Sequence, residues 1–260
     1  MSIKEKVIGK INIFFILKNW NDYFLDFFGM KKGKKVVYHL RNGLKYKTRG
    51  GSTDRNVLNE ILVYGDYSPK GFEIKRNDII VDIGAHIGIF SIYAGSKNPD
   101  GKVFSFEPLE ENFKILKENI ILNNLQNTTP VNFACSNKSE RRELFLTKSN
   151  NFGETSFFGK NRENKVTINT INFKDFLREK NIKKVDLLKI DCEGAEYEIL
   201  FNLTSKDLTK IEKIVMEVHN VNNEKNIWHL GSFLLKNNFV LKVNGSPNSQ
   251  TSMLYAKKRH

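Results

Sequence analysis

From residue 78 onward, short apolar segments alternate with amphipathic segments whose apolar residues recur at helical spacing. The apolar segments predict strands at residues 79–83, 102–106, 129–134, 185–190 and 213–218. The segments after them predict helices at residues 86–95, 110–123, 173–180, 195–203 and 227–236. Alternation of this kind predicts an α/β fold with a mostly parallel sheet and helices on both of its faces.

The remaining strands lie near a polar insert and at the end of the chain. Residues 142–147 and 165–170 predict strands on either side of the insert at residues 148–164. Residues 239–243 and 252–256 predict two short strands separated by Asn244-Gly245-Ser246-Pro247. Because that linker is rich in turn residues, we expect the last two strands to form an antiparallel hairpin at one sheet edge.

The chain before the sheet predicts an extension of different character. Residues 1–30 have apolar residues at loosely helical spacing, and residues 35–49 predict a hairpin around Asn42-Gly43. Thr53 or Asp54 is expected to cap a short helix that ends near residue 64. We therefore expect a helical and β-hairpin extension at residues 1–65 and the main domain at residues 66–260.

Composition excludes several classes of protein. With 40% hydrophobic residues the 260-residue chain can bury a core, which excludes global disorder. The two cysteines, Cys135 and Cys192, are too few for a disulfide framework or a structural zinc site. No apolar run approaches the roughly 20 residues of a transmembrane helix. We therefore expect a cytoplasmic protein without a membrane span.

The net charge of +13 leaves two questions about partners. Most lysines are scattered and only residues 31–35 form a compact basic run, so a solvated surface is favoured over a nucleic-acid groove. Residues 1–30 support two interpretations: a helical cap on the main domain, or an interfacial helix in peripheral contact with a membrane.

A glycine turn follows the first strand of the predicted sheet, in the pattern Asp82-x-Gly84-x-x-x-Gly88. The dinucleotide fingerprint requires glycines where this chain has His86 and Ile89, and a histidine side chain obstructs the approach of a pyrophosphate. The turn therefore suits a ligand without diphosphate, with Asp82 pairing an ammonium group and the turn amides holding a carboxylate.

A second acidic residue, Glu107, ends the next strand just before Pro108. A carboxylate there can accept both hydroxyls of a ribose. An amino acid plus a ribose, without diphosphate, describes S-adenosylmethionine. Glu60, just before the main domain, has two interpretations: it closes over the cofactor, or it is a solvated side chain.

These segments resemble the FkbM family of S-adenosylmethionine-dependent methyltransferases. The resemblance is carried by residues 81–88, by Phe106-Glu107-Pro108, by Met216-Glu217-Val218-His219, and most specifically by residues 188–196 (LKIDCEGAE). It implies a class I Rossmann-like sheet of seven strands and O-methylation. The expected cofactor-binding residues are Asp82, Gly84, Ala85, His86, Gly88, Glu107, Pro108, Leu109, Ala134, Asp191 and Glu60.

The candidate catalytic residues lie at two neighbouring strand ends: Lys189, Asp191, Glu193, Glu217 and His219. In one interpretation Asp191 or His219 is the general base and Glu217 orients His219. In a second, Asp191, Glu217 and His219 hold Mg²⁺ or Mn²⁺, which acidifies the acceptor hydroxyl. In a third, Lys189 and Glu217 form a buried pair and His219 has a structural role.

The sequence thus predicts an S-adenosylmethionine-dependent O-methyltransferase acting on a hydroxyl of a sugar, glycolipid or small metabolite. Two alternatives stay open at this stage. The net charge allows an RNA methyltransferase, and the fold alone allows a binding module that has lost turnover.

Overall fold

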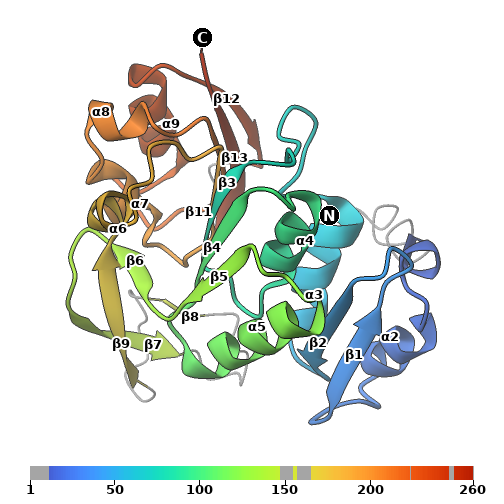
Figure 1. Cartoon of the computed structure of the whole chain (residues 1–260). Coiled ribbons are helices and arrows are strands. Elements are labelled where there is room, and N and C mark those ends of the chain that lie inside the picture. The colour runs from blue at the N-terminus through green and yellow to red at the C-terminus, as the bar shows by residue number, and fades with distance from the viewer. Residues whose placement is uncertain (1–11, 147–154, 157–164, 223, 246–248, 260) are drawn as a thin grey trace.

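A computed structural model describes residues 12–146, 155–156, 165–222, 224–245 and 249–259. Its centre is a seven-stranded sheet (Figure 1). The strand order is β12 (Phe239–Asn244), β13 (Thr251–Lys258), β11 (Lys213–His219), β10 (Leu187–Ile190), β3 (Ile79–Ile83), β4 (Lys102–Phe106) and β5 (Thr128–Val131). Neighbours from β11 to β5 are parallel, whereas β13 is antiparallel to both β11 and β12. The predicted α/β class and C-terminal edge hairpin are confirmed.

Each central strand is buried on both faces. Successive side chains point to opposite sides of the sheet, so neighbouring residues enter different cores. Val81, Leu188 and Ile214 belong to one apolar core. Ile80, next to Val81, and Val215, next to Ile214, belong to the other. Near-continuous apolar strands therefore separate two cores, one on each face of the sheet.

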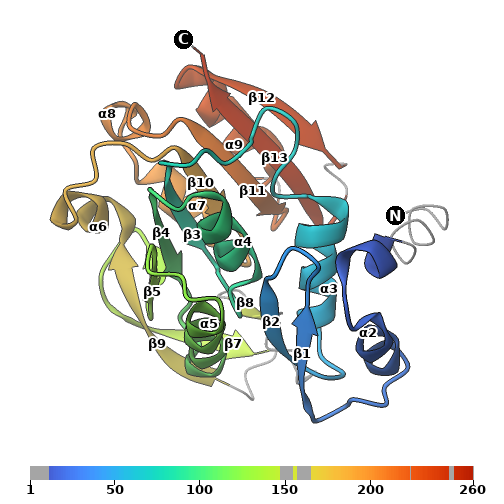
Figure 2. The ribbon, with the colours of Figure 1, turned by 45° about the vertical axis from the view of Figure 1, so that its right-hand side comes forward.

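Helices cover both faces (Figures 1 and 2). α4 (Ile89–Lys97) and α5 (Glu110–Leu122) contribute to one core. α6 (Phe173–Glu179), α7 (Glu196–Phe201) and α9 (Ile227–Lys236) contribute to the other, and α8 (Ser205–Leu208) follows α7. The first predicted helix begins three residues late, at Ile89, because Gly88 has a left-handed φ of 87° and ends the turn before it.

The predicted strand at residues 129–134 is wrong as a single element. β5 ends at Val131, and β6 (Ala134–Ser136) starts a separate four-stranded sheet with β9 (Lys165–Asn172), β7 (Arg141–Leu146) and β8 (Thr155–Ser156). The polar insert expected at residues 148–164 lies outside the described residues except for β8.

The N-terminal extension contains α2 (Trp20–Phe27), the predicted hairpin of β1 (Lys35–His39) and β2 (Lys45–Arg49), and α3 (Asp54–Leu58). Thr53 occupies the expected N-cap position, but its side chain makes no cap hydrogen bond. α3 continues into η1 (Asn59–Tyr64), a π-helix, where a plain α-helix was expected.

Two asparagines of α5 join the extension to the main domain. Asn119 and Asn123 each accept a hydrogen bond from, and donate one to, the backbone of β2, at Lys47 and Lys45 respectively. They act as a partner for the free edge of the hairpin. The extension and α4–α5 also share one apolar core, and the division at residue 65 remains a prediction.

Within the described residues, no helix combines the length and apolar character that a membrane span requires. The N-terminal end of the segment considered for peripheral membrane contact, residues 1–11, lies outside the described residues.

Candidate active site

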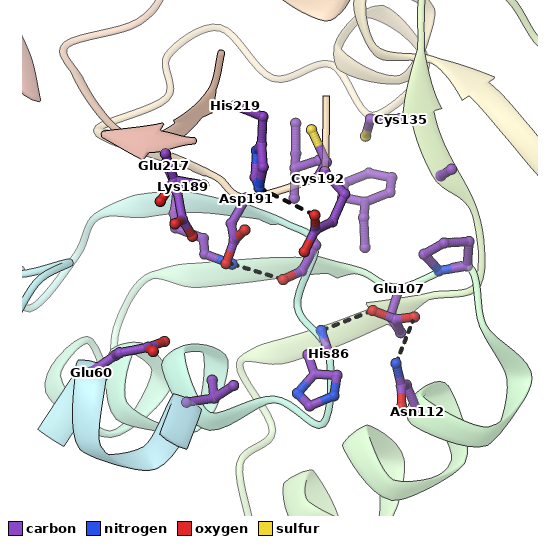
Figure 3. A pocket seen from close by; sticks show the side chains of 18 of the residues that line it. Glu60, His86, Glu107, Asn112, Cys135, Lys189, Asp191, Cys192, Glu217 and His219 are labelled. Carbon is purple, nitrogen blue, oxygen red and sulfur yellow. Dashed lines mark hydrogen bonds and ion pairs between the residues drawn. The ribbon is translucent and has the colours of Figure 1, made fainter. Parts of the chain in front are cut away.

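A cavity of about 640 Å³ opens where the carboxyl ends of β3, β4, β10 and β11 meet, with α3 and η1 as its outer wall. Ligands of open α/β sheets bind at this edge. Figure 3 shows Glu107 and Asn112 on one side, Asp191, Glu217 and His219 on the other, and Glu60 across from them on the helical wall. All five predicted catalytic residues line the cavity, as do Gly84, His86, Glu107, Pro108, Ala134, Asp191 and Glu60 of the predicted cofactor set.

The glycine turn shapes the floor of this cavity. Gly84 has a φ of 76°, and a Cβ built there would lie 1.6 Å from the carbonyl oxygen of Asp191, so only glycine lets β3 and β10 end side by side. The amides of Gly84 and Ala85 both donate to the carbonyl of Phe106, at 3.0 and 2.8 Å. The expectation that the turn amides bind a carboxylate is therefore not supported at these positions.

Ala85, Gly88 and Leu109 support the cavity from behind and are not among its lining residues. Gly88 instead lies against α5, where an added Cβ would meet Leu116 at 2.4 Å. The Leu109 amide donates to Glu107 at 2.9 Å. These residues position the loops that carry the lining side chains.

Glu107 is 5% exposed and accepts three hydrogen bonds. The donors are the amides of Leu109 and His86, both at 2.9 Å, and Nδ2 of Asn112 at 3.3 Å. Burial raises the pKa of Glu107 to about 7, even though these bonds favour the anion. A ligand that adds hydroxyl donors would therefore stabilise a carboxylate that is already oriented.

Asp82 has a different position from the one expected. It is fully buried, does not line the cavity, accepts from Ser91 Oγ at 2.6 Å and lies 3.1 Å from Nζ of Lys189. Lys189 Nζ also lies 3.7 Å from Asp191 and donates to the carbonyl of Gly84 at 2.7 Å. Asp82 therefore holds Lys189, and the interpretation that paired Lys189 with Glu217 is wrong.

Asp191 is fixed from two sides. Besides the contact with Lys189, it accepts a 2.9 Å hydrogen bond from the hydroxyl of Tyr67, a residue 3% exposed between η1 and β3. Burial would lower the pKa of Lys189, but Asp82 and Asp191 raise it above its ordinary value. The lysine therefore stays charged and counters Asp191.

His219 lies between two carboxylates. Its Nδ1 is 2.7 Å from Glu196 Oε1 and its Nε2 is 3.2 Å from Glu193 Oε2. Carboxylates only accept hydrogen bonds, so both ring nitrogens carry protons and His219 is a cation. Burial would lower the pKa of His219, but its bonds to Glu193 and Glu196 raise it to about 11. Glu217 does not orient His219, and this cation cannot serve as the general base.

Glu217 and Glu60 are the remaining carboxylates of the cavity. Burial, with Asp191 nearby, raises the pKa of Glu217 to about 7. The Glu60 side chain is exposed and lines the cavity, where partial loss of solvent, with Asp191 and Glu217 nearby, raises its pKa to about 8. Both carboxyl groups therefore exchange protons near neutral pH.

The possible metal ligands come together, as predicted. Asp191, Glu217 and His219 offer one ligand atom each within 4.8 Å of one another. However, a neutral ring nitrogen is needed for ligation, and both nitrogens of His219 are committed to Glu193 and Glu196. The donor set fits an ion-paired imidazolium better than a metal ligand.

Comparison with known proteins identifies the family. A family model described as the methyltransferase FkbM domain matches residues 82–241, which span the glycine turn and both strand ends that carry the candidate catalytic residues. The chain belongs to the FkbM methyltransferase family. It is therefore a methyltransferase by family, with the predicted class I sheet.

Two methyltransferases show what kinds of protein this chain is similar to. The 31-O-demethyl-FK506 methyltransferase FkbM of Streptomyces tacrolimicus is 26% identical over 216 residues, covering 72% of this chain and 83% of that protein. The hexuronic acid methyltransferase AglP of Haloferax volcanii is 26% identical over 175 residues, covering 66% of this chain and 69% of that protein.

A solved structure supports the fold. The methyltransferase FkbM from Methylobacillus flagellatus KT aligns with a TM-score of 0.51 and 15% identity, covering 78% of this chain and 53% of that one. At this identity the likeness concerns the FkbM fold alone.

Three contributors to this FkbM-family site escaped the sequence analysis: Tyr67, Asn112 and Glu196. Glu196 is the last residue of the LKIDCEGAE segment, so the segment itself carried the signal. Asn112 follows Glu107 by five residues at the start of α5, a spacing that could have suggested a partner. Tyr67 is 124 positions before Asp191, and no local pattern marks it.

Proposed function

We propose that this FkbM-family protein uses S-adenosylmethionine to methylate a hydroxyl group of a sugar, glycolipid or small metabolite. The proposal is carried by one observation: Glu107 lies at one end of the cavity and the Asp191–Glu217 pair at the other. A carboxylate that can bind a ribose is thus separated, within one cavity, from carboxylates that can bind a cation or accept a proton.

The cavity suits the cofactor in size and charge. Its volume of about 640 Å³ is in the range of small-molecule sites. Glu107 would accept the ribose hydroxyls, and the small side chain of Ala134 leaves room beside them for the adenine ring. Glu60 and Asp191 would face the cationic end of the cofactor. S-adenosylmethionine, when bound, supplies a methyl group on a sulfonium that becomes a neutral thioether after transfer.

The protein's own task is to align the acceptor and to remove its proton. Asp191 is held by Tyr67 and Lys189, and His219 is already protonated, so neither is free to take a proton. Glu217 has an oxygen within 4.8 Å of an atom of each of these residues, and its pKa of about 7 suits proton transfer at neutral pH. We assign the general base to Glu217 and an orienting role to His219 and Asp191.

The acidic lining supports a neutral hydroxyl acceptor over RNA. Glu60, Asp191, Glu193 and Glu217 face the cavity, and a phosphate backbone would be repelled by them. Among the relatives, one is named for a hexuronic acid and another for the 31-O position of FK506. The first name supports a sugar acid as the class of acceptor, and the second supports an oxygen acceptor.

The decisive experiment follows labelled methyl from S-adenosylmethionine into polysaccharide, lipid, small-metabolite and RNA fractions. We expect label in one of the first three. Glu217→Gln should lower the transfer rate by about 10²- to 10⁴-fold while calorimetry shows cofactor binding within a few-fold of the native protein. Glu110→Gln, an exposed residue of α5, is the matched control. Label in RNA would overturn the proposed class of acceptor. Full activity of Glu217→Gln would overturn the assignment of Glu217 as the general base.

A further inference from the structure

One face of α2, with Phe28 directly after it, carries an aromatic stripe in which Trp20, Phe27 and Phe28 are exposed. Trp20, Phe24, Phe27 and Phe28 recur at helical spacing, with Trp20 and Phe24 rings 6.2 Å apart and Phe27 and Phe28 rings 5.3 Å apart. Phe14 extends the stripe by packing on Trp20 at 4.9 Å. The stripe thus consists of two groups of packed rings on one side of the same helix.

The other face of α2 is fixed to the molecule. Tyr23 is 4% exposed and packs on Tyr38, and Asp26 is 1% exposed and accepts from the hydroxyl of Tyr38 at 2.8 Å and the amide of Gly51 at 2.6 Å. Arg55 of α3 lies 5.2 Å from the Phe27 ring. The aromatic stripe is thus presented by a rigid support joined to the cavity wall.

The surface formed by residues 14–30 exposes an unusually large share of the apolar side chains of the described protein. Six of the fourteen exposed large hydrophobic side chains of the described residues lie between positions 14 and 30, and Phe15, Phe28 and Met30 are 74%, 68% and 64% exposed. Isolated exposed apolar side chains are ordinary, but a concentration of this kind marks an interaction surface. We call these residues the apolar patch: Phe14, Phe15, Trp20, Phe27, Phe28 and Met30.

The charges around the patch have one sign. Exposed basic side chains flank it at Lys18, Lys32, Lys34, Lys35 and Arg41. The only acidic residues between positions 12 and 50 are Asp22, which pairs with Lys31 at 2.9 Å, and Asp26, which is buried. An apolar surface with exposed basic side chains around it complements a membrane surface, where anionic headgroups lie over acyl chains.

We propose that the apolar patch and its basic rim bind the surface of an anionic bilayer. Phe15, Phe28 and Met30 enter the interface, while the lysines of residues 32–35 contact headgroup phosphates. The aromatic side chains suit this boundary because their rings are apolar and Trp20 also has an N–H group. The proposal is independent of the methyl acceptor, since it concerns the extension and not the cavity.

The test is co-sedimentation of the full chain with vesicles of 70% phosphatidylcholine and 30% phosphatidylglycerol, against pure phosphatidylcholine. We expect binding to the anionic vesicles and at least tenfold weaker partitioning for Phe15→Ser/Phe28→Ser. Ile121→Ser, which removes an apolar side chain 73% exposed on α5, should bind like the native protein. In Lys32→Ser/Lys34→Ser/Lys35→Ser, partitioning onto the anionic vesicles should fall by about fivefold for each lysine removed. Lys180→Ser/Lys183→Ser/Lys206→Ser, three exposed positions elsewhere, removes the same charge as a control.

A fluorescence readout checks the geometry. In a Trp228→Phe background only Trp20 emits, and its spectrum should shift to shorter wavelength on anionic vesicles. Unchanged thermal unfolding of each surface variant would show that the fold is intact. Equal binding to both vesicle types, no binding to either, or unchanged binding of the patch variant would overturn the proposal. Self-association lost in the patch variant, without vesicle binding, would assign the patch to a second copy instead.

Discussion

The Nδ1 atom of His219 lies 2.7 Å from Oε1 of Glu196, a carboxylate that is 0% exposed at the start of α7. Glu193 takes the other ring nitrogen, and it does so from a left-handed backbone conformation with a φ of 53°. Because a non-glycine residue is strained there, the turn is organised around this contact. The imidazolium of His219 is consequently a fixed positive charge beside Asp191 and Glu217.

We predict that His219 stays protonated throughout neutral pH. Its pKa is raised from 6.5 to about 11, so the stabilisation from the charged ring is complete below pH 6.5 and is lost as pH rises toward 11. Nitrogen NMR of the ring should show the imidazolium at pH 8. In Glu196→Gln the ring should titrate at lower pH, while Glu198→Gln, whose carboxylate pairs with Arg142, should leave it unchanged. A neutral ring in the native protein at pH 8 contradicts the assignment.

We predict that Gly84 cannot be replaced by alanine. The added Cβ would overlap the backbone of Asp191, so Gly84→Ala should cost more than about 4 kcal/mol or prevent folding. Gly33→Ala is the matched control, since Gly33 has a φ of 74° with nothing within 4 Å and should cost only about 1–2 kcal/mol. Urea unfolding measures both. Similar costs would mean that φ alone, and not the contact with Asp191, requires glycine.

The sheet was predictable because each strand has its own local signal. An apolar run such as residues 79–83 and a turn glycine at 84 specify strand, turn and direction without knowledge of the neighbouring chain. The glycine turn and Glu107 were accordingly located at the cavity from spacing alone.

The ion pairs were not predictable, because they depend on which side chains meet across strands. Lys189 lies opposite Asp82 in the register of β10 and β3, so it pairs with Asp82 and not with Glu217. In the same way, a positive φ at Glu193 turns that side chain toward His219, and a sequence gives no sign of it. Most positions at the cavity thus followed from strand ends, whereas the contacts that depend on strand register did not follow from the sequence.

We predict that Asn119→Ala loosens the N-terminal extension. Asn119 donates to the carbonyls of Lys47 and Ile87 and accepts from the amide of Lys47 at 2.7 Å, so its loss leaves buried backbone groups without partners. The free energy of unfolding should fall by about 2–3 kcal/mol. Gln126→Ala, an exposed position beyond the same helix, should stay within about 0.5 kcal/mol. An equal loss in both variants would remove Asn119 from the docking contact.

We predict that Glu107 contributes to cofactor affinity and not to the transfer step. Glu107→Gln keeps the shape but removes the charge that would accept ribose hydroxyls, so the Kd for S-adenosylmethionine should rise about 10- to 100-fold. The rate at saturating cofactor should change little, because the carboxylate lies across the cavity from Glu217. Glu110→Gln is the control. A lowered saturated rate with an unchanged Kd would place Glu107 in the chemistry instead.

We predict that the pH dependence of kcat reports Glu217. A base must be deprotonated to act, so the rate should rise about tenfold per pH unit below the pKa of about 7 and level off above it. The groups that set this pKa are Asp191, His219, Glu193 and Thr251, and none of them is removed in Glu217→Asp. That variant should keep a rising limb, whereas Glu217→Gln should lose both the limb and most of the rate.

Glu60, across the cavity from Glu217, could produce the same rise of kcat with pH, because its own pKa is raised to about 8. Because Glu60 has the higher pKa, it is still mostly protonated where Glu217 titrates, so Glu60→Gln should leave the limb assigned to Glu217 nearly unchanged. If Glu60→Gln abolished the limb while Glu217→Gln retained it, the base would be Glu60. Because η1 carries Glu60, proton transfer would then depend on the N-terminal extension and not on β11.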